Sequence, residues 1–167
     1  CIALGVAVIT GVGALTGALL NGFAAQGRVL LGGDVTLRRV HRKATDAERA
    51  EIARLGKVSE TATMRSMARL VDGDDQTLVE VKAIDEAYPL LGSVELASGG
   101  TIDEAVRNAG GAVVAQSLLD RLGLAVGDTF KLGTSPIKIT GVLRYEPDKI
   151  TARLSFGPRV MVSHETL

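Results

Sequence analysis

The first 27 residues of the chain contain no Asp, Glu, Lys or Arg, and this feature limits the possible folds more than any other. The 19 basic and 19 acidic residues all lie from Arg28 onward. A helix rises about 1.5 Å per residue, so this segment can reach ~40 Å, more than the ~30 Å hydrocarbon core of a bilayer. A helix that is apolar on every side must also be covered on every side. Residues 1–27 are therefore predicted to form a transmembrane-type helix.

The residues within this segment suit a lipid environment. Thr10 and Thr16 can donate their hydroxyl groups to carbonyl groups of their own helix. Gly13 and Gly17 have GxxxG spacing, which lets two helices approach closely in a membrane. The spacing is frequent by chance in a Gly- and Ala-rich segment, so Gly13 and Gly17 are helix-packing candidates on this pattern alone.

Three other interpretations of the segment differ in how well they fit. A secretory signal has an apolar region of about 7–15 residues and a small-residue cleavage site, and this segment is longer and lacks the site. Acylation at Cys1 would place a polar tether next, but the most apolar part of the chain follows instead. A dinucleotide fingerprint opened by Gly11 and Gly13 would need a third glycine where Thr16 stands. A cleaved leader on a soluble exported binding or scaffold domain stays as the alternative.

Residues 28–167 are long enough to bury a core of their own, and they are predicted to form one domain. Basic and acidic residues are equal in number, which argues against a nucleic-acid interface because such interfaces need clustered Lys and Arg. The single cysteine, Cys1, excludes an intrachain disulfide.

Short helices and alternating strands dominate this domain, so the fold class is α+β with a mixed or antiparallel sheet. Capping boxes at Thr45 and Thr101 predict short helices, which end near Gly56 and at Gly110. Alternation on both sides of a turn at residues 72–75 predicts a hairpin. The expected strands are 35–38, 61–70, 76–84, 112–115, 129–132, 137–145 and 159–163, and the expected helices are 46–55, the segment from 101 to 110, and 116–122.

Residues that could carry chemistry are sparse. His41 and His164 have no Cys or carboxylate at zinc-ligand spacing, so both are interpreted as surface residues. The acidic residues at 72–75 resemble a cation loop but lack its closing Glu, and the chain has no phosphate-binding loop. No catalytic, metal or cofactor-binding residue is predicted, and the chain is not expected to be an enzyme. The basic run from Arg38 to Lys43 favours a solvated face, with lipid headgroups as the other candidate partner.

One long segment of the sequence resembles a known family. Residues 112–133, which include Leu122-Gly123-Leu124 and Val126-Gly127-Asp128, are followed by an alternating segment at 137–143. This phrase resembles the MacB/FtsX-type ABC transporter permeases, where a helix, an "LGL-x-VGD" turn and a β-hairpin follow one another. The segments 32–35 and 156–162 resemble the YbbP-like branch of that family.

The resemblance implies an extracytoplasmic domain, 28–167, behind a first membrane helix, 1–27, in the bacterial inner membrane. It implies an ABC ATPase as partner through other parts of the permease, mechanotransmission from ATP hydrolysis, a hydrophobic or lipid-like cargo, and a periplasmic protein as a further partner. It also leads us to expect more of the permease after Leu167. Residues before Cys1 are expected on other grounds, because a membrane anchor of this kind normally has positive charges before it. The resemblance transfers no functional residue.

Overall fold

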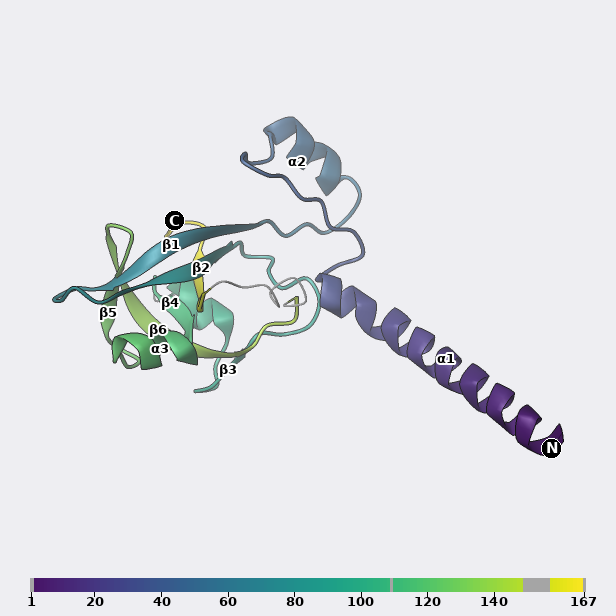
Figure 1. Ribbon diagram of the computed structural model, residues 1–167. Helices are drawn as coiled ribbons and strands as arrows, with labels where there is room; N and C mark the ends of the chain where they lie inside the picture. The colour runs from purple at the N-terminus through teal and green to yellow at the C-terminus, as the bar shows by residue number, and fades with distance from the viewer. Residues whose placement is uncertain (1, 109, 149–156, 167) are drawn as a thin grey trace.

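The structure is a computed structural model that describes residues 2–108, 110–148 and 157–166. An apolar helix, α1 (Ile2–Leu31), is followed by a mixed sheet of seven strands with a few short helices. The predicted α+β class is confirmed. Figure 1 shows α1 extending away from the sheet as a single rod.

The α1 helix packs against nothing along most of its length. Its stretch Gly5–Val29 is 25 residues long, is apolar enough to cross a membrane, and is not buried in the chain. Thr10 and Thr16 donate their hydroxyl groups to the carbonyl oxygens of Val6 and Val12, at 2.8 and 2.9 Å. The predicted return of both hydroxyl groups to their own helix is confirmed, so neither exposes an unpaired donor to lipid.

The sheet closes on itself. Its order is β3-β6-β4-β7-β2-β1-β5, and β5 also pairs with the first part of β6, so six strands form a ring and β3 lies outside it. Closure satisfies strand edges that would otherwise be open. The strands are β1 (Thr61–Leu70), β2 (Gln76–Ile84), β3 (Glu95–Leu96), β4 (Ala112–Ala115), β5 (Thr129–Leu132), β6 (Ser135–Tyr145) and β7 (Arg159–Ser163).

Two apolar clusters hold the domain together. The larger lies inside the barrel and includes Phe130, Val81 and Ile139, all fully or almost fully buried. The helix α3 (Gln116–Leu122) adds Leu118 to it. The smaller cluster lies where the connection after β2 packs back on the sheet, and it includes Met161. Small aliphatic side chains fill a barrel of this size, which accounts for the few aromatic residues.

Most predicted elements are confirmed. The hairpin joins β1 and β2 with Thr61 opposite Ile84 and Arg69 opposite Gln76. The first capping box holds α2 (Asp46–Ala53), and α3 ends at Gly123, which has the left-handed φ of 65°. The second box forms at Thr101, but the turns that follow are a π-helix, η1 (Asp103–Asn108).

The predicted strand at residues 35–38 is wrong. Gly32 has a left-handed φ of 73° and turns the chain away from the sheet after α1, so this segment has no strand to pair with. It runs exposed to α2, and none of the helical residues of α2 is buried. The alternation of residues 35–38 therefore predicted a strand in a segment that pairs with no other strand in the described part of the chain. The short β3 strand was not predicted, because two residues are too few to show a period.

Candidate functional site: a buried ionic junction at the end of α1

Five polar side chains meet at the face of the sheet opposite the barrel core, in a cluster that we call the ionic junction: Lys82, Tyr88, Glu146, Asp148 and Arg159. The Lys82 ammonium group donates to Glu146 Oε1 at 2.8 Å, to Asp148 Oδ2 at 2.6 Å and to the Tyr88 hydroxyl at 2.9 Å. Tyr88 donates its hydroxyl to Asp148 Oδ1 at 2.7 Å. Arg159 Nε donates to the second oxygen of Glu146 at 3.1 Å. Each carboxylate thus accepts from two different groups.

Strand geometry explains why these charges face one another. Side chains alternate along β2, so Lys82 points to the opposite face from the core residues Val81 and Ala83. The strands β2 and β7 are parallel, and Glu80 is paired with Arg159 in register. The Arg159 guanidinium group lies 3.2 Å from a Glu80 carboxylate oxygen as well as against Glu146.

The ionic junction is unusually deep for charged groups. Lys82 is 5% exposed, Glu146 1% and Arg159 8%. Burying a charge costs several kcal/mol unless partners and hydrogen bonds compensate for the lost water. Here the three donor hydrogens of Lys82 have three oxygen partners, so the cost is offset within the cluster. Removing one partner would leave the others uncompensated.

Two pKa shifts follow from this arrangement. Burial, then the neighbouring Asp148 carboxylate, raises the pKa of Tyr88 far above its usual range, so the hydroxyl keeps its proton and can donate it. Burial alone would raise the pKa of Asp148, but the charge and hydrogen bond of Lys82 and the hydrogen bond of Tyr88 bring it below its usual value. The cluster therefore holds Asp148 ionised and Tyr88 neutral.

The ionic junction touches the end of α1. The helix finishes in a Schellman motif, with Gly32 N donating to Val29 O at 3.1 Å and Gly33 N donating to Arg28 O at 3.0 Å. A Cβ atom on Gly32 would lie 3.2 Å from Asp148 Cβ. The backbone at the end of α1 thus lies directly against a member of the junction.

A second close contact lies beside it. A Cβ atom added to Gly92 would lie 2.8 Å from Pro147 Cβ and 3.1 Å from Val29 Cγ1, and the φ of Gly92 is 78°. Glycine is therefore required where the loop after β2 passes between α1 and the segment after β6. Val29, Gly92 and Pro147 form the apolar side of the contact, and the ionic junction forms its polar side.

A second ionic cluster lies on the surface, at the start of α2. Arg42 donates two hydrogen bonds to the Glu48 carboxylate, both at 2.8 Å, and Arg39 adds a third at 2.7 Å. Glu48 also accepts from Thr45 N at 3.0 Å. The Arg42 hydrogen bond, with the other partners, lowers the pKa of Glu48 well below its usual range. We call this group the Glu48 clasp.

The residues singled out from the sequence lie elsewhere. Gly13 and Gly17 lie on the open surface of α1, with no atom near enough to contact an added Cβ. His41 is exposed with a left-handed φ of 66°, whereas His164 is half-buried and its Nε2 lies 3.0 Å from Glu60 O. Asp72 belongs to the exposed hairpin turn. In the described part of the chain, no three His, Cys, Asp or Glu side chains gather as a metal site would require.

Sequence reasoning missed the ionic junction because its members are far apart in the chain. One signal was present: Lys82 stands between the apolar residues Val81 and Ala83 in a strand whose other face is apolar. A second was the acidic pair Glu146 and Asp148 directly after the longest strand. Only the parallel β2–β7 pairing, which the sequence does not specify, shows that Arg159 joins them.

The profile of the MacB-like periplasmic core domain matches residues 1–167, the whole chain. The chain belongs to the MacB-like periplasmic core domain family. It is 29% identical over 163 residues to the uncharacterized ABC transporter permease YbbP of Escherichia coli (strain K12). That match covers 97% of this chain but only 19% of the relative, so the chain spans about a fifth of that protein.

Solved structures agree on the fold. The extracellular domain of the noncanonic ABC-type transporter YknZ from Gram-positive bacteria matches with a TM-score of 0.50 and 16% identity, over 65% of this chain and 55% of that one. A domain of a protein described as a permease from Porphyromonas gingivalis matches with a TM-score of 0.50 and 21% identity, over 65% and 46%. The resemblance to ABC permeases is confirmed. The chain is therefore an extracytoplasmic domain of the type found in ABC transporter permeases.

Proposed function

We propose that this chain transmits movement between a membrane helix and an extracytoplasmic barrel in an ABC permease of the bacterial inner membrane. Residues 1–27 lie in the bilayer and residues 28–167 lie outside it. An ABC ATPase, bound by parts of the permease beyond this chain, supplies the movement. The observation that carries the proposal is the contact between the capped end of α1 and the buried ionic junction.

The ionic junction suits this role because the capped end of α1 lies against it and its own hydrogen bonds to the sheet are short. Gly32 lies against Asp148, and Asp148 is bonded to Lys82 in β2. Lys82 shares Glu146 with Arg159 in β7. Packed and hydrogen-bonded groups of this kind pass on a displacement as a unit rather than absorb it. A tilt of α1 would therefore turn the barrel with it.

The cargo and the packing of α1 are finer parts of the proposal. The family resemblance favours a hydrophobic or lipid-like cargo and a periplasmic protein partner. Gly13 and Gly17 would pack α1 against another membrane helix, since their face is open along the rod. Replacing both with leucine is expected to weaken helix–helix crosslinking in bilayers. Unchanged crosslinking would contradict the proposed packing of α1 through Gly13 and Gly17.

The test uses the intact permease with its ATPase in lipid nanodiscs, with Thr134 in the barrel changed to a labelled cysteine. Trapping the ATPase with ATP and vanadate, which leaves ADP and vanadate bound, is expected to shift the distance between this label and the bilayer surface. The Gly92→Ala variant should keep ATP hydrolysis by the partner and lose most of the shift, because the added methyl group separates α1 from Pro147.

The matched control is Gly99→Ala, where φ is 75° but no atom lies within contact distance of the added carbon. This variant should keep both the hydrolysis and the shift. Failure of any ATPase to co-purify, or an equal shift in Gly92→Ala, would contradict the proposal.

A further inference from the structure

The segment Val35–Lys43, which joins α1 to α2, has a composition unlike the rest of the surface. We call it the juxtamembrane segment. It holds four basic residues and no acidic one, whereas the whole chain is balanced. Three of its apolar side chains are strongly exposed: Val35 at 79%, Leu37 at 63% and Val40 at 67%. Apolar and basic groups side by side on a surface suit a lipid interface, where charged headgroups lie next to the acyl chains.

The Glu48 clasp gives the segment a defined shape. Arg39 and Arg42 both reach back to Glu48, and the left-handed conformation of His41 makes the turn between them. Arg38 and Lys43 make no ion pair with any residue that the structure describes. The clasp thus pairs two of the four cations with Glu48, and the other two, Arg38 and Lys43, are exposed.

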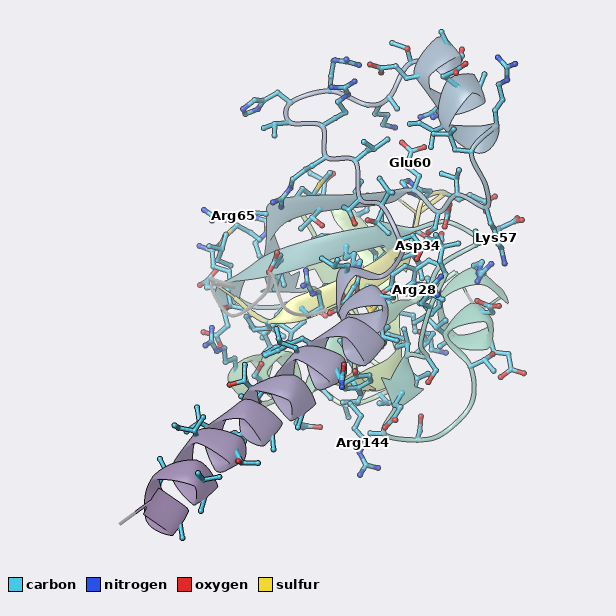
Figure 2. All side chains as sticks on the ribbon, turned by 90° about the vertical axis from the view of Figure 1, so that its right-hand side faces the viewer. Arg28, Asp34, Lys57, Glu60, Arg65 and Arg144 are labelled. Carbon is cyan, nitrogen blue, oxygen red and sulfur yellow. The ribbon has the colours of Figure 1, made fainter. Side chains whose placement is uncertain are left out.

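The position of the segment follows from its link to α1. Gly33, which ends the Schellman motif, is two residues before Val35, so the segment begins within a few residues of the end of the membrane-type stretch at Val29. In Figure 2 the chain passes Arg28 and Asp34 and continues to one side of the helix axis. Figure 1 shows it carrying α2 outside the barrel, so no part of the sheet covers it.

Charge placement adds an independent argument. Loops that flank membrane helices carry an excess of Lys and Arg on the cytoplasmic side, where they help to set orientation. A concentration of four basic residues directly after α1 on the other side works against that bias. Solvation alone needs no such concentration, but negatively charged headgroups would bind it.

We propose that the juxtamembrane segment docks on the anionic phospholipid headgroups of the leaflet at which α1 ends. Arg38 and Lys43 contact the phosphate groups, and Val35, Leu37 and Val40 enter the boundary between headgroups and acyl chains. The inference rests on the proposed membrane location of α1. Docking at a second point beside the helix would fix the rotation of the domain about the α1 axis, which a single helix leaves free.

The test uses the full chain reconstituted in bilayers, with Cys1→Ser and a fluorophore on Val40→Cys. The bilayers contain phosphatidylcholine alone or with phosphatidylglycerol, and each carries a quencher attached to the lipid headgroup. We expect strong quenching only with phosphatidylglycerol, and loss of quenching in high salt because screening weakens the headgroup contacts. Arg38→Gln with Lys43→Gln should reduce the equilibrium constant for docking by roughly fivefold for each removed charge.

The matched control is Lys57→Gln with Lys138→Gln, which removes two exposed charges outside the segment and should leave quenching unchanged. A second label on Leu15→Cys reports whether α1 is in the bilayer. If Leu15 is inserted and Val40 is not quenched, or is quenched equally in both lipids, only the docking proposal fails. If Leu15 is not inserted, the membrane location of the proposed function fails and the docking proposal with it. Protection of Val40 that depends on protein density and not on lipid would assign the surface to a second copy and overturn the proposal.

Discussion

The ionic junction and the Glu48 clasp use the same chemistry in opposite environments. In the junction a lysine and an arginine share the buried Glu146 carboxylate, with Lys82 5% exposed. In the clasp two arginines share Glu48 in α2, a helix in which every residue is at least partly exposed. Water replaces the partners of a broken surface pair at little cost, whereas nothing replaces those of a buried pair.

This contrast separates two structural tasks. The ionic junction fixes the segment after β6 to β2 and β7, and Gly32 at the capped end of α1 lies against Asp148 in that segment. The Glu48 clasp shapes the juxtamembrane segment and can open without disturbing the core. Changes to the first should therefore be global and costly, and changes to the second should be local.

The largest effect is expected for Lys82→Met. The substitution removes the shared donor, leaves Asp148 without a cation and leaves the buried Glu146 with Arg159 alone, which should cost about 3–5 kcal/mol of unfolding free energy. Urea unfolding followed by circular dichroism measures this. Lys57→Met, at an exposed position, should change stability by less than about 0.5 kcal/mol. Equal effects of the two variants would show that burial does not distinguish the junction.

The apolar side of the contact is tested by Gly92→Ala. A left-handed non-glycine residue costs about 1–2 kcal/mol, and displacing Pro147 and Val29 adds about 1–3 kcal/mol. Gly99→Ala carries the same backbone cost without the collision, since its surroundings are open. The difference between the unfolding midpoints of the two variants measures the contribution of the contact at Gly92. Midpoints that coincide would mean that α1 does not press on this loop.

Acid should weaken the ionic junction through Asp148. The pKa of this carboxyl is below its ordinary value of 3.8 in the folded chain, so the unfolded chain takes up the proton first as pH falls. Its contribution to stability is complete above about pH 5 and is lost as pH falls through the folded pKa. Thermal midpoints between pH 6 and acid conditions measure the slope, which Asp148→Asn should flatten. Asp74→Asn controls for loss of one exposed carboxylate, and an unchanged slope in Asp148→Asn would refute the linkage.

The smallest effect is expected for Glu48→Gln. It weakens three arginine contacts and the capping box of α2, so amide hydrogens of α2 should exchange faster. The unfolding midpoint of the barrel should stay where it is. Glu51→Gln, which removes only the exposed pair with Arg54, is the control and should leave α2 exchange nearly as in the unaltered chain. A lower unfolding midpoint of the barrel would show that α2 and the Glu48 clasp contribute to the stability of the core.

Local patterns in the sequence predicted most elements because each carries its own signal. The hairpin shows alternation around a Gly- and Asp-containing turn, and the capping boxes at Thr45 and Thr101 involve residues three apart. The ionic junction carries no such signal, since Lys82 lies 64 positions from Glu146 and only the closed barrel brings them together. The wrong strand at residues 35–38 has the same cause, because pairing depends on a partner that local alternation cannot supply.

The most direct test of the central claim is the distance between α1 and the barrel in a bilayer. Spin labels on Leu20→Cys and Thr134→Cys, with Cys1→Ser, report it by pulsed electron resonance. We expect one narrow distribution in the unaltered chain. We expect a broad distribution in Lys82→Met under conditions where circular dichroism shows the barrel still folded. A broad distribution in the unaltered chain, or a narrow one in Lys82→Met, would contradict the claim that the ionic junction joins α1 and the barrel into one body.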